Sequence, residues 1–178
     1  MNEREKMLSG ELYRADDPEL TRLRARAREL TRRFNETGDQ AVLRELLGRV
    51  GENVWIEPPF FCDYGENIAL GDGAYLNTGC VVLDCAAVEI GPRALLGPAV
   101  QIYAATHPTE AAVRREGLEL ARLVTIGEDA WIGGAAVLGP GVTVGARSTV
   151  GAGSVVVGDV PADVVAVGNP CRVVRSLA

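Results

Sequence analysis

The stretch Val124–Val157 reads VTIGED AWIGGA AVLGPG VTVGAR STVGAG SVVV when it is divided into sixes. A glycine follows the aliphatic residue in the first five hexads, and the aliphatic positions are Ile126, Ile132, Leu138, Val144, Val150 and Val156. A period of six matches neither the turn of an α-helix nor the alternation of a strand. It predicts short strands joined by tight corners, with the aliphatic side chains inside a coil. The glycines are expected to adopt backbone conformations that other residues resist. Such coils bury a continuous core only by stacking.

The step of six continues upstream of this stretch, with interruptions, to about residue 53. The pattern fails for about residues 103–123, a segment that contains Pro108, several charged residues and the single histidine. We expect this segment to be an extended loop that projects from the coil. Long loops on rigid scaffolds often carry functional residues. The period ends after Val156, so the sequence predicts a coil domain over 53–160 and a C-terminal tail over 161–178.

Residues 1–52 differ in composition and are expected to be helical. One apolar stripe at spacings of three and four is formed by Leu20, Leu23, Ala27, Leu30 and Phe34. Thr37-Gly38 is expected to end this helix, and Asp39 can cap a second one that closes at Gly48. The arginine-rich face of the first helix is interpreted as a solvated surface of a segment that packs on the coil domain.

Composition excludes several classes of protein. The net charge of −6 over 178 residues argues against a general nucleic-acid or anionic-membrane binder. The N-terminus lacks the apolar core of a signal peptide, and no apolar run reaches the roughly 18 residues of a membrane span. The four cysteines show no paired spacing, so they are interpreted as reduced thiols of a cytoplasmic protein.

His107 is the first candidate for chemistry. An imidazole titrates near neutral pH and can take a proton from a hydroxyl group. A base of this kind needs a partner on its other nitrogen. Glu119 is the nearest plausible carboxylate in the loop, and a backbone carbonyl is the alternative.

A second group of residues suits either of two interpretations. Carboxylates, amides and aromatic rings bind sugar hydroxyls well, but Asp and Asn are also common at corners and turns. The residues in question are Asp16, Asp17, Asp63, Tyr64, Tyr75, Asn77 and Asp84.

A third group lies in the second half of the chain. Gly134 and Ala152 leave the backbone open to a ligand, and Trp131 either lies against such a ligand or covers a corner. Arg172 and Arg175 either hold phosphate groups or form a solvated tail. We predict no metal site, because one histidine per chain and no alternative cluster cannot assemble the three-histidine zinc site of some β-helix enzymes. No cysteine lies in the loop or beside the histidine, so none is expected to act as a nucleophile.

The hexads resemble those of the left-handed β-helix acyltransferases. More narrowly, the chain resembles the maltose/galactoside O-acetyltransferases, including the related nodulation enzyme, along nearly its whole length. The segments that carry the resemblance are KMLSGELYRADDPEL, RLRARAREL, FCDYGENIALGDGAYLNTGCVVLD, IYAATHP, VTIGEDAWIGGAAVLGPGVTVG and GNPCRVVR. The resemblance implies a left-handed coil, a homotrimer with sites between neighbouring subunits, and acetyl-CoA as co-substrate.

The resemblance also implies roles for individual residues. His107 stands where the family has its general base, and Glu119 lies where it often carries a carboxylate. The acceptor-sugar side is matched by Asp16 or Asp17, Asp63, Tyr75, Asn77 and Asp84. Gly134 and Ala152 match backbone positions along the arm of coenzyme A, and Arg172 and Arg175 match basic residues near its phosphates. A lysine that is common in the family is absent at Gly158, which either weakens coenzyme A binding or leaves the two arginines to suffice.

The sequence therefore predicts a cytoplasmic, acetyl-CoA-dependent sugar O-acetyltransferase that works by direct transfer. Three alternatives remain open: an acetyltransferase of the same fold with another acceptor, such as serine, an antibiotic or a polysaccharide; a non-catalytic scaffold; and a nucleic-acid binder that uses the arginine-rich helix.

Overall fold

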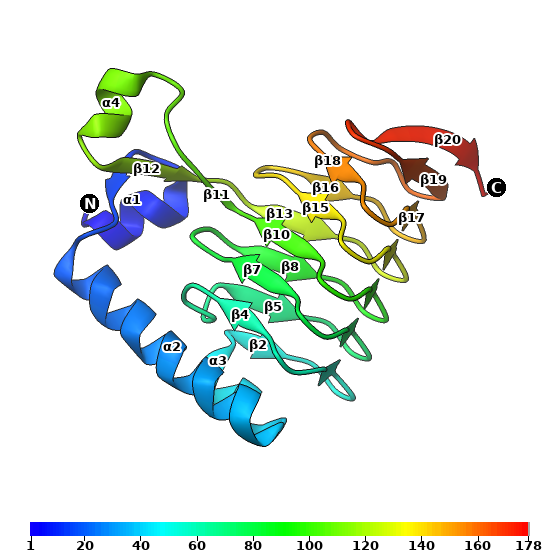
Figure 1. Cartoon of the computed structure of the whole chain (residues 1–178), viewed down its shortest axis with the longest axis horizontal. Helices are drawn as coiled ribbons and strands as arrows, with labels where there is room; N and C mark the ends of the chain where they lie inside the picture. The colour runs from blue at the N-terminus through cyan, green and yellow to red at the C-terminus, as the bar shows by residue number, and fades with distance from the viewer. Residues whose placement is uncertain (178) are drawn as a thin grey trace.

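The hexads form a parallel β-helix whose coils stack along one axis, in a computed structural model that describes residues 1–177 (Figure 1). Five complete coils contain three short strands each. The strands of the first three coils are β2 (Arg49–Val50), β3 (Trp55–Ile56), β4 (Phe61–Cys62), β5 (Ile68–Leu70), β6 (Tyr75–Leu76), β7 (Val81–Leu83), β8 (Val88–Ile90), β9 (Leu95–Leu96) and β10 (Gln101–Tyr103). Those of the next two are β13 (Val124–Ile126), β14 (Trp131–Ile132), β15 (Val137–Leu138), β16 (Thr143–Val144), β17 (Thr149–Val150) and β18 (Val155–Val156). The predicted fold class is confirmed.

Each strand pairs in parallel with its equivalents in the coils above and below. The stacked coils therefore form a three-sided prism, and each face is one parallel sheet. The first face contains β2, β5, β8, β13 and β16, and the third face contains β4, β7, β10, β15 and β18. The second face contains β3, β6, β9, β14 and β17, extended by β19 and β20. The first coil begins at Arg49, a few residues before the expected boundary at 53.

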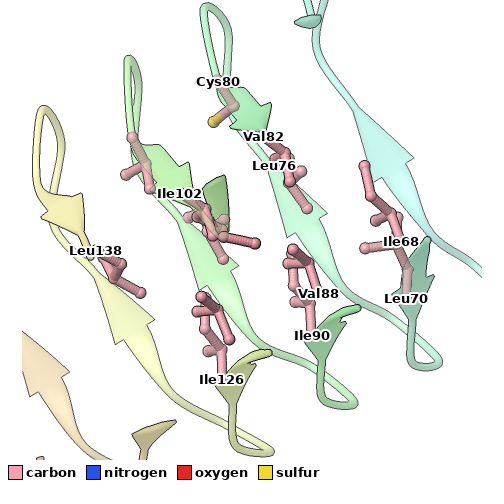
Figure 2. Close-up of a cluster of buried hydrophobic side chains, with 14 of the residues drawn as sticks. Ile68, Leu70, Leu76, Cys80, Val82, Val88, Ile90, Ile102, Ile126 and Leu138 are labelled. Atoms are coloured by element: carbon pink, nitrogen blue, oxygen red, sulfur yellow. The ribbon is translucent and has the colours of Figure 1, made fainter. Parts of the chain in front are cut away.

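The aliphatic residues of the hexads point into the coils, as predicted. Ile126, Ile132, Leu138, Val144, Val150 and Val156 are all 0–1% exposed. Figure 2 shows Ile68, Val88 and Ile126 inside successive coils, where each layer of side chains packs on the next. Because a single coil cannot cover its own interior, burial along the whole stack supplies the stabilising core.

The hexad glycines do not take the conformation expected of them. Within residues 1–177, positive φ values in this stretch occur two positions after each of those glycines, at Asp129, Ala135, Gly141, Arg147 and Gly153. Gly133 is needed for a different reason: a Cβ atom there would lie 2.4 Å from the backbone nitrogen of Ala152 in the next coil. Glycine is therefore selected by the close stacking of the coils.

Three helices precede the coil, where the sequence predicted two. The first, α1 (Glu3–Ser9), was not predicted, although Asn2 and Glu5 form a capping box at its start. The second, α2 (Pro18–Thr37), buries the predicted apolar stripe and ends at Gly38, and the third is α3 (Ala41–Leu46). In Figure 1, α2 runs alongside the first coils.

The excursion between β10 and β13 has structure of its own. Strands β11 (Ala105–Thr106) and β12 (Leu118–Ala121) pair in antiparallel fashion and are joined through α4 (Ala111–Arg115). Strand β1 (Tyr13–Arg14) from the N-terminal segment pairs with the outer edge of β12, and this three-stranded sheet projects from the coil stack in Figure 1. The loop leaves the coil at the corner between the third and first faces.

The expected tail over 161–178 continues the fold, and its residue 178 lies outside the described residues. Strand β19 (Val164–Val167) pairs in parallel with β17 and begins a further partial coil. Strand β20 (Arg172–Ser176) folds back antiparallel to β19 and lies at the far end of the stack from the helices (Figure 1).

Candidate active site

His107 follows β11 at the start of the projecting loop. Its side chain is exposed and lines a cavity of about 540 Å³. The rest of the lining comes from Leu12, Thr106, Pro108, Thr109, Glu110, Val113, Leu120, Arg122 and Pro140. An exposed imidazole beside a cavity is accessible to a substrate, as a general base must be.

Glu119 does not share this cavity with His107. It lies on β12, directly before Leu120, which faces the His107 cavity. The Tyr13 hydroxyl, fully buried on β1, donates a hydrogen bond of 2.9 Å to Oε2 of Glu119. Burial, with Cys85 and Glu119 beside it, raises the pKa of Tyr13 above its usual range. The described chain therefore does not bring Glu119 to the imidazole, and nothing in residues 1–177 places it as the partner of His107.

A second, more polar cavity of about 280 Å³ lies on the other side of β12. Asp63 and Glu119 line it together with Ala15, Arg24, Arg28, Tyr64 and Cys85. The Cys85 thiol donates to Oδ2 of Asp63 at 3.5 Å, and burial raises the pKa of Cys85 to about 12. Burial also raises the pKa of Asp63, although Cys85, Arg24 and Arg28 act in the opposite direction. Asp63, predicted on the acceptor side, and Glu119, predicted in the loop, thus line one cavity, which we call the candidate acceptor cavity.

Asp84 is placed differently from the other predicted acceptor residues. Its side chain is completely buried, and its carboxylate accepts backbone N–H bonds from Asp63 at 3.1 Å, Tyr64 at 2.8 Å and Asn67 at 3.3 Å. Burial raises the pKa of Asp84 to about 7. A carboxylate enclosed in this way offers no surface to a sugar hydroxyl, so Asp84 shapes the corner that presents Asp63.

Asp16 and Asp17, at the start of α2, are placed differently. Asp17 is the N-cap of α2, and its carboxylate accepts from the N–H groups of Glu19 and Leu20. Asp16 is exposed. Because the Asp17 carboxylate is already engaged, Asp16 is the member of the pair whose side chain is open to a ligand.

A third set of predicted residues lies on the corner between the second and third faces. Successive coils are joined there by backbone hydrogen bonds of 2.8–2.9 Å, from Gly79 to Pro59, Ala99 to Thr78, Ala135 to Pro98 and Gly153 to Gly134. Asn77, Gly134 and Ala152 therefore belong to one column along the coil axis. Within residues 1–177 the N–H groups of Gly134 and Ala152 donate to no other group, so both are free to face a ligand.

Tyr75 and Trp131 flank this column on the second face. Both are register partners of Leu95, in β6 and β14 respectively, so the three residues form a row across neighbouring coils. Trp131 is 55% exposed and Leu95 is 47% exposed. This row is an apolar outer surface beside the open corner.

Arg172 and Arg175 are exposed on β20, at the end of the stack. The Arg172 guanidinium donates to the Cys171 carbonyl at 2.8 Å and lines a small cavity of about 160 Å³ with Gly158 and Asp159. A Cβ atom at Gly158 would meet nothing within 4 Å. This cavity thus has one basic group, Arg172, and open space at Gly158, where the family's lysine is absent.

Sequence reasoning missed several residues in and beside these cavities, among them Tyr13, Cys85 and Arg28. Tyr13 contacts Glu119 across more than a hundred residues of chain, and nothing in the sequence marks that pairing. Cys85 and Arg28 were interpreted as a free thiol and a solvated arginine. Their signals were the two extra residues near Cys85 and the i, i+4 spacing of Arg24 and Arg28.

The described residues also bear on metals and membranes. Across residues 1–177, no three His, Cys, Asp or Glu side chains gather as a metal site would require. None of the helices described for this chain is long and apolar enough to cross a bilayer.

Comparison with known proteins identifies the family of the chain. Residues 6–51 match the maltose acetyltransferase hexapeptide capping motif, and residues 124–158 match the bacterial transferase hexapeptide of six repeats. Nodulation protein L of Rhizobium leguminosarum bv. viciae is 51% identical over 178 residues, which cover 97% of this chain and 94% of that protein.

Two solved structures have nearly the same backbone. A maltose O-acetyltransferase from Clostridium difficile 630 gives a TM-score of 0.98 at 44% identity, covering 100% of this chain and 98% of that one. A galactoside acetyltransferase in complex with coenzyme A gives a TM-score of 0.96 at 36% identity, covering 100% and 92%. The chain therefore belongs to the maltose/galactoside O-acetyltransferase family of hexapeptide-repeat proteins, which confirms the resemblance carried by its motifs.

Proposed function

We propose that this acetyltransferase moves the acetyl group of acetyl-CoA directly to a hydroxyl of a sugar, with His107 as the general base. The observation that carries the proposal is the exposed imidazole of His107 on the projecting loop, beside a cavity of about 540 Å³. The bound coenzyme A of the galactoside relative supports the donor, and the names of the maltose and galactoside relatives support the acceptor.

The reaction needs one proton to move twice. His107 takes the proton of the acceptor hydroxyl as its oxygen attacks the thioester carbonyl, which forms the new C–O bond. The C–S bond then breaks, and the imidazolium returns its proton to the departing thiolate. Gly134 N–H is our candidate donor to the oxyanion, a type of contact worth on the order of 10²–10³ in rate.

The corner column holds the donor in this proposal. Coenzyme A lies along the column of Gly134 and Ala152, beside Trp131, with its phosphates towards Arg172 and Arg175. Guanidinium groups suit phosphate oxygens through charge-assisted hydrogen bonds. A rigid column of this kind fixes the thioester in one orientation, which removes much of the entropic cost of bringing two substrates together.

We also propose that the enzyme is a homotrimer with each site between neighbouring subunits. Within one chain, His107 projects from the corner between the third and first faces, whereas Asn77, Gly134 and Ala152 lie at a different corner. A second copy brings the loop of one chain to the column of the next. The exposed row that contains Leu95 and Trp131 offers an apolar surface for this contact.

The test is thiol release from acetyl-CoA in the presence of a panel of mono- and disaccharides, with the products analysed by mass spectrometry and NMR. We expect release that depends on the sugar and an ester on a single hydroxyl. Acetylation of serine or an antibiotic instead, with no sugar turned over, would assign another acceptor. No release with any acceptor, from protein that binds acetyl-CoA, would contradict the proposed activity.

A further inference from the structure

The candidate acceptor cavity does not end at Asp63. A larger cavity of about 400 Å³ opens beside it, lined by Phe61 and Cys62 of the first coil and by residues of α2. Arg28 lines both cavities. The two are therefore neighbours that share a wall residue.

Helix α2 and residues 61–64 contribute to both cavities, and Ala15, Cys85 and Glu119 complete the smaller one. On α2, Arg24 and Arg28 line the smaller one, and Arg28, Thr31 and Asn35 line the larger one. Spacings of four, three and four place these residues on one face of the helix. On the coil, the consecutive pairs Phe61–Cys62 and Asp63–Tyr64 form the opposite wall. The two adjacent cavities, which lie between α2 and residues 61–64, are together called the trench.

The larger cavity has an apolar floor and a fixed polar rim. The Phe61 side chain is 48% exposed. Asn35 holds the backbone of Phe60 through two hydrogen bonds, of 2.8 and 2.9 Å, and so fixes the segment that carries the ring. Arg32 is paired with Glu29 and Glu36, and Arg28 is exposed at the junction.

This combination suits a sugar ring. A pyranose presents an apolar C–H face and a polar edge of hydroxyls, which matches an aromatic side chain flanked by hydrogen-bonding groups. The smaller cavity alone lies just below the range of ordinary ligand pockets, about 300–1,000 Å³, whereas the trench lies within it. Its position next to the candidate acceptor cavity, with Arg28 in both linings, favours a part of the acceptor as the occupant.

We propose that the 400 Å³ cavity is a second acceptor subsite, which holds the neighbouring ring of a disaccharide or oligosaccharide whose reacting ring lies by Asp63 and Glu119. This inference rests on the proposed sugar O-acetyltransferase function. It makes Phe61 a residue that sets preference for acceptor length. The chemical class it assigns is a glycoside of at least two rings.

The experiment compares kcat/KM for a monosaccharide and for the matching disaccharide in wild type, Phe61→Ala and Phe61→Tyr. We expect Phe61→Ala to lower the value for the disaccharide about 10-fold, the scale of one stacked ring, and to leave the monosaccharide value unchanged. Phe61→Tyr keeps the aromatic face and should retain the preference. Val157→Ala, which trims an exposed apolar side chain of a distant coil, is the matched control.

A binding measurement separates this inference from the proposed function. Saturation-transfer NMR with the same disaccharide should show protein contact at both rings in wild type and at one ring in Phe61→Ala. If the enzyme transfers acetyl to no sugar, the proposed function fails, and the NMR measurement still tests whether the second subsite binds a sugar ring. Equal losses of kcat/KM on both acceptors, or no contact at the second sugar ring, would overturn the inference. A changed oligomeric size of Phe61→Ala would also overturn it, because a second copy of the chain would then cover the Phe61 side chain.

Discussion

Asp84 shows how position changes the chemistry of a single side chain. Its carboxylate accepts three backbone N–H groups at one corner, yet burial dominates and raises the pKa of Asp84 from 3.8 to about 7. Aspartate is common at exposed corners, so the sequence alone could not distinguish this buried residue from Asp63 beside it. Only the surrounding packing decides which of the two faces the cavity.

The raised pKa of Asp84 predicts a pH dependence of stability. The folded state holds this proton more tightly than the unfolded chain, so the contribution is fully present below pH 3.8 and is lost as pH rises through about 7. We expect the melting temperature of the wild type to contain a fall between about pH 4 and 7 that Asp84→Asn reduces. Circular dichroism melts across this range provide the measurement, and an unchanged slope in the variant would contradict the assignment.

Gly158 permits a gain-of-affinity prediction. The position is open, and Arg172 lies in the same small cavity, so a lysine fits there and adds a cation near the proposed phosphate end of coenzyme A. We expect Gly158→Lys to lower KM for acetyl-CoA about 3- to 10-fold, which is on the order of 1 kcal/mol, with kcat unchanged. Gly158→Gln is the uncharged control. An equal effect of both variants, or no effect of either, would count against phosphates at this end.

At the scale of elements, the hexads were the most readable part of the chain. Their period predicted the coils and the inward side chains, because the residues that recur every six positions are the ones buried inside the coil. The role of the glycines was mispredicted, since stacking against the next coil is a contact between distant residues. Strand β19 was missed for a related reason: Val164–Val167 carries no hexad glycine, and its place is set by pairing with β17.

The three-stranded sheet β1-β12-β11 links the N-terminal segment to the loop that carries His107. We expect Tyr13→Phe to destabilise the fold by about 1–2 kcal/mol, because the Glu119 carboxylate loses the buried hydroxyl that donates to it. The same change should lower kcat by loosening the loop and leave KM for acetyl-CoA unchanged. Urea unfolding and steady-state kinetics measure the two effects.

The matched control for that variant is Tyr103→Phe, whose hydroxyl contacts Gln101 on its own strand. This control should leave kcat near the wild-type value. If Tyr13→Phe unfolds more readily but keeps full kcat, the sheet only stabilises the segment and does not position the loop.

For the whole molecule, the separation of the candidate residues is the main finding. His107, the Asp63–Glu119 cavity and the column of Gly134 and Ala152 occupy three places on one chain. The sequence singled out His107, Asp63, Glu119, Gly134 and Ala152 as candidates, but it could not show which of them one chain brings together. That depends on how far the loop projects and on which corner each residue occupies.

A shared site predicts complementation between inactive variants. His107→Ala lacks the base, and Ala152→Trp is expected to block the coenzyme A column at an exposed corner. If each site takes its histidine from one subunit and its column from the next, random mixing in trimers restores about a quarter of the sites. Thiol release after the two variants are dissociated and reassembled together gives the measurement. No activity in the mixture, with mixed trimers verified by mass, would place the whole site on one chain.

The most direct test of the account is the rate of sugar acetylation by His107→Ala. The protein must first be shown to be folded, to have the wild-type oligomeric size and to bind acetyl-CoA with unchanged affinity. We predict a loss of about 10²-fold or more in kcat, the scale expected of a general base, with KM for acetyl-CoA little changed. A His107→Ala enzyme that acetylates sugars at the wild-type rate would contradict the central claim that this imidazole takes the proton of the acceptor.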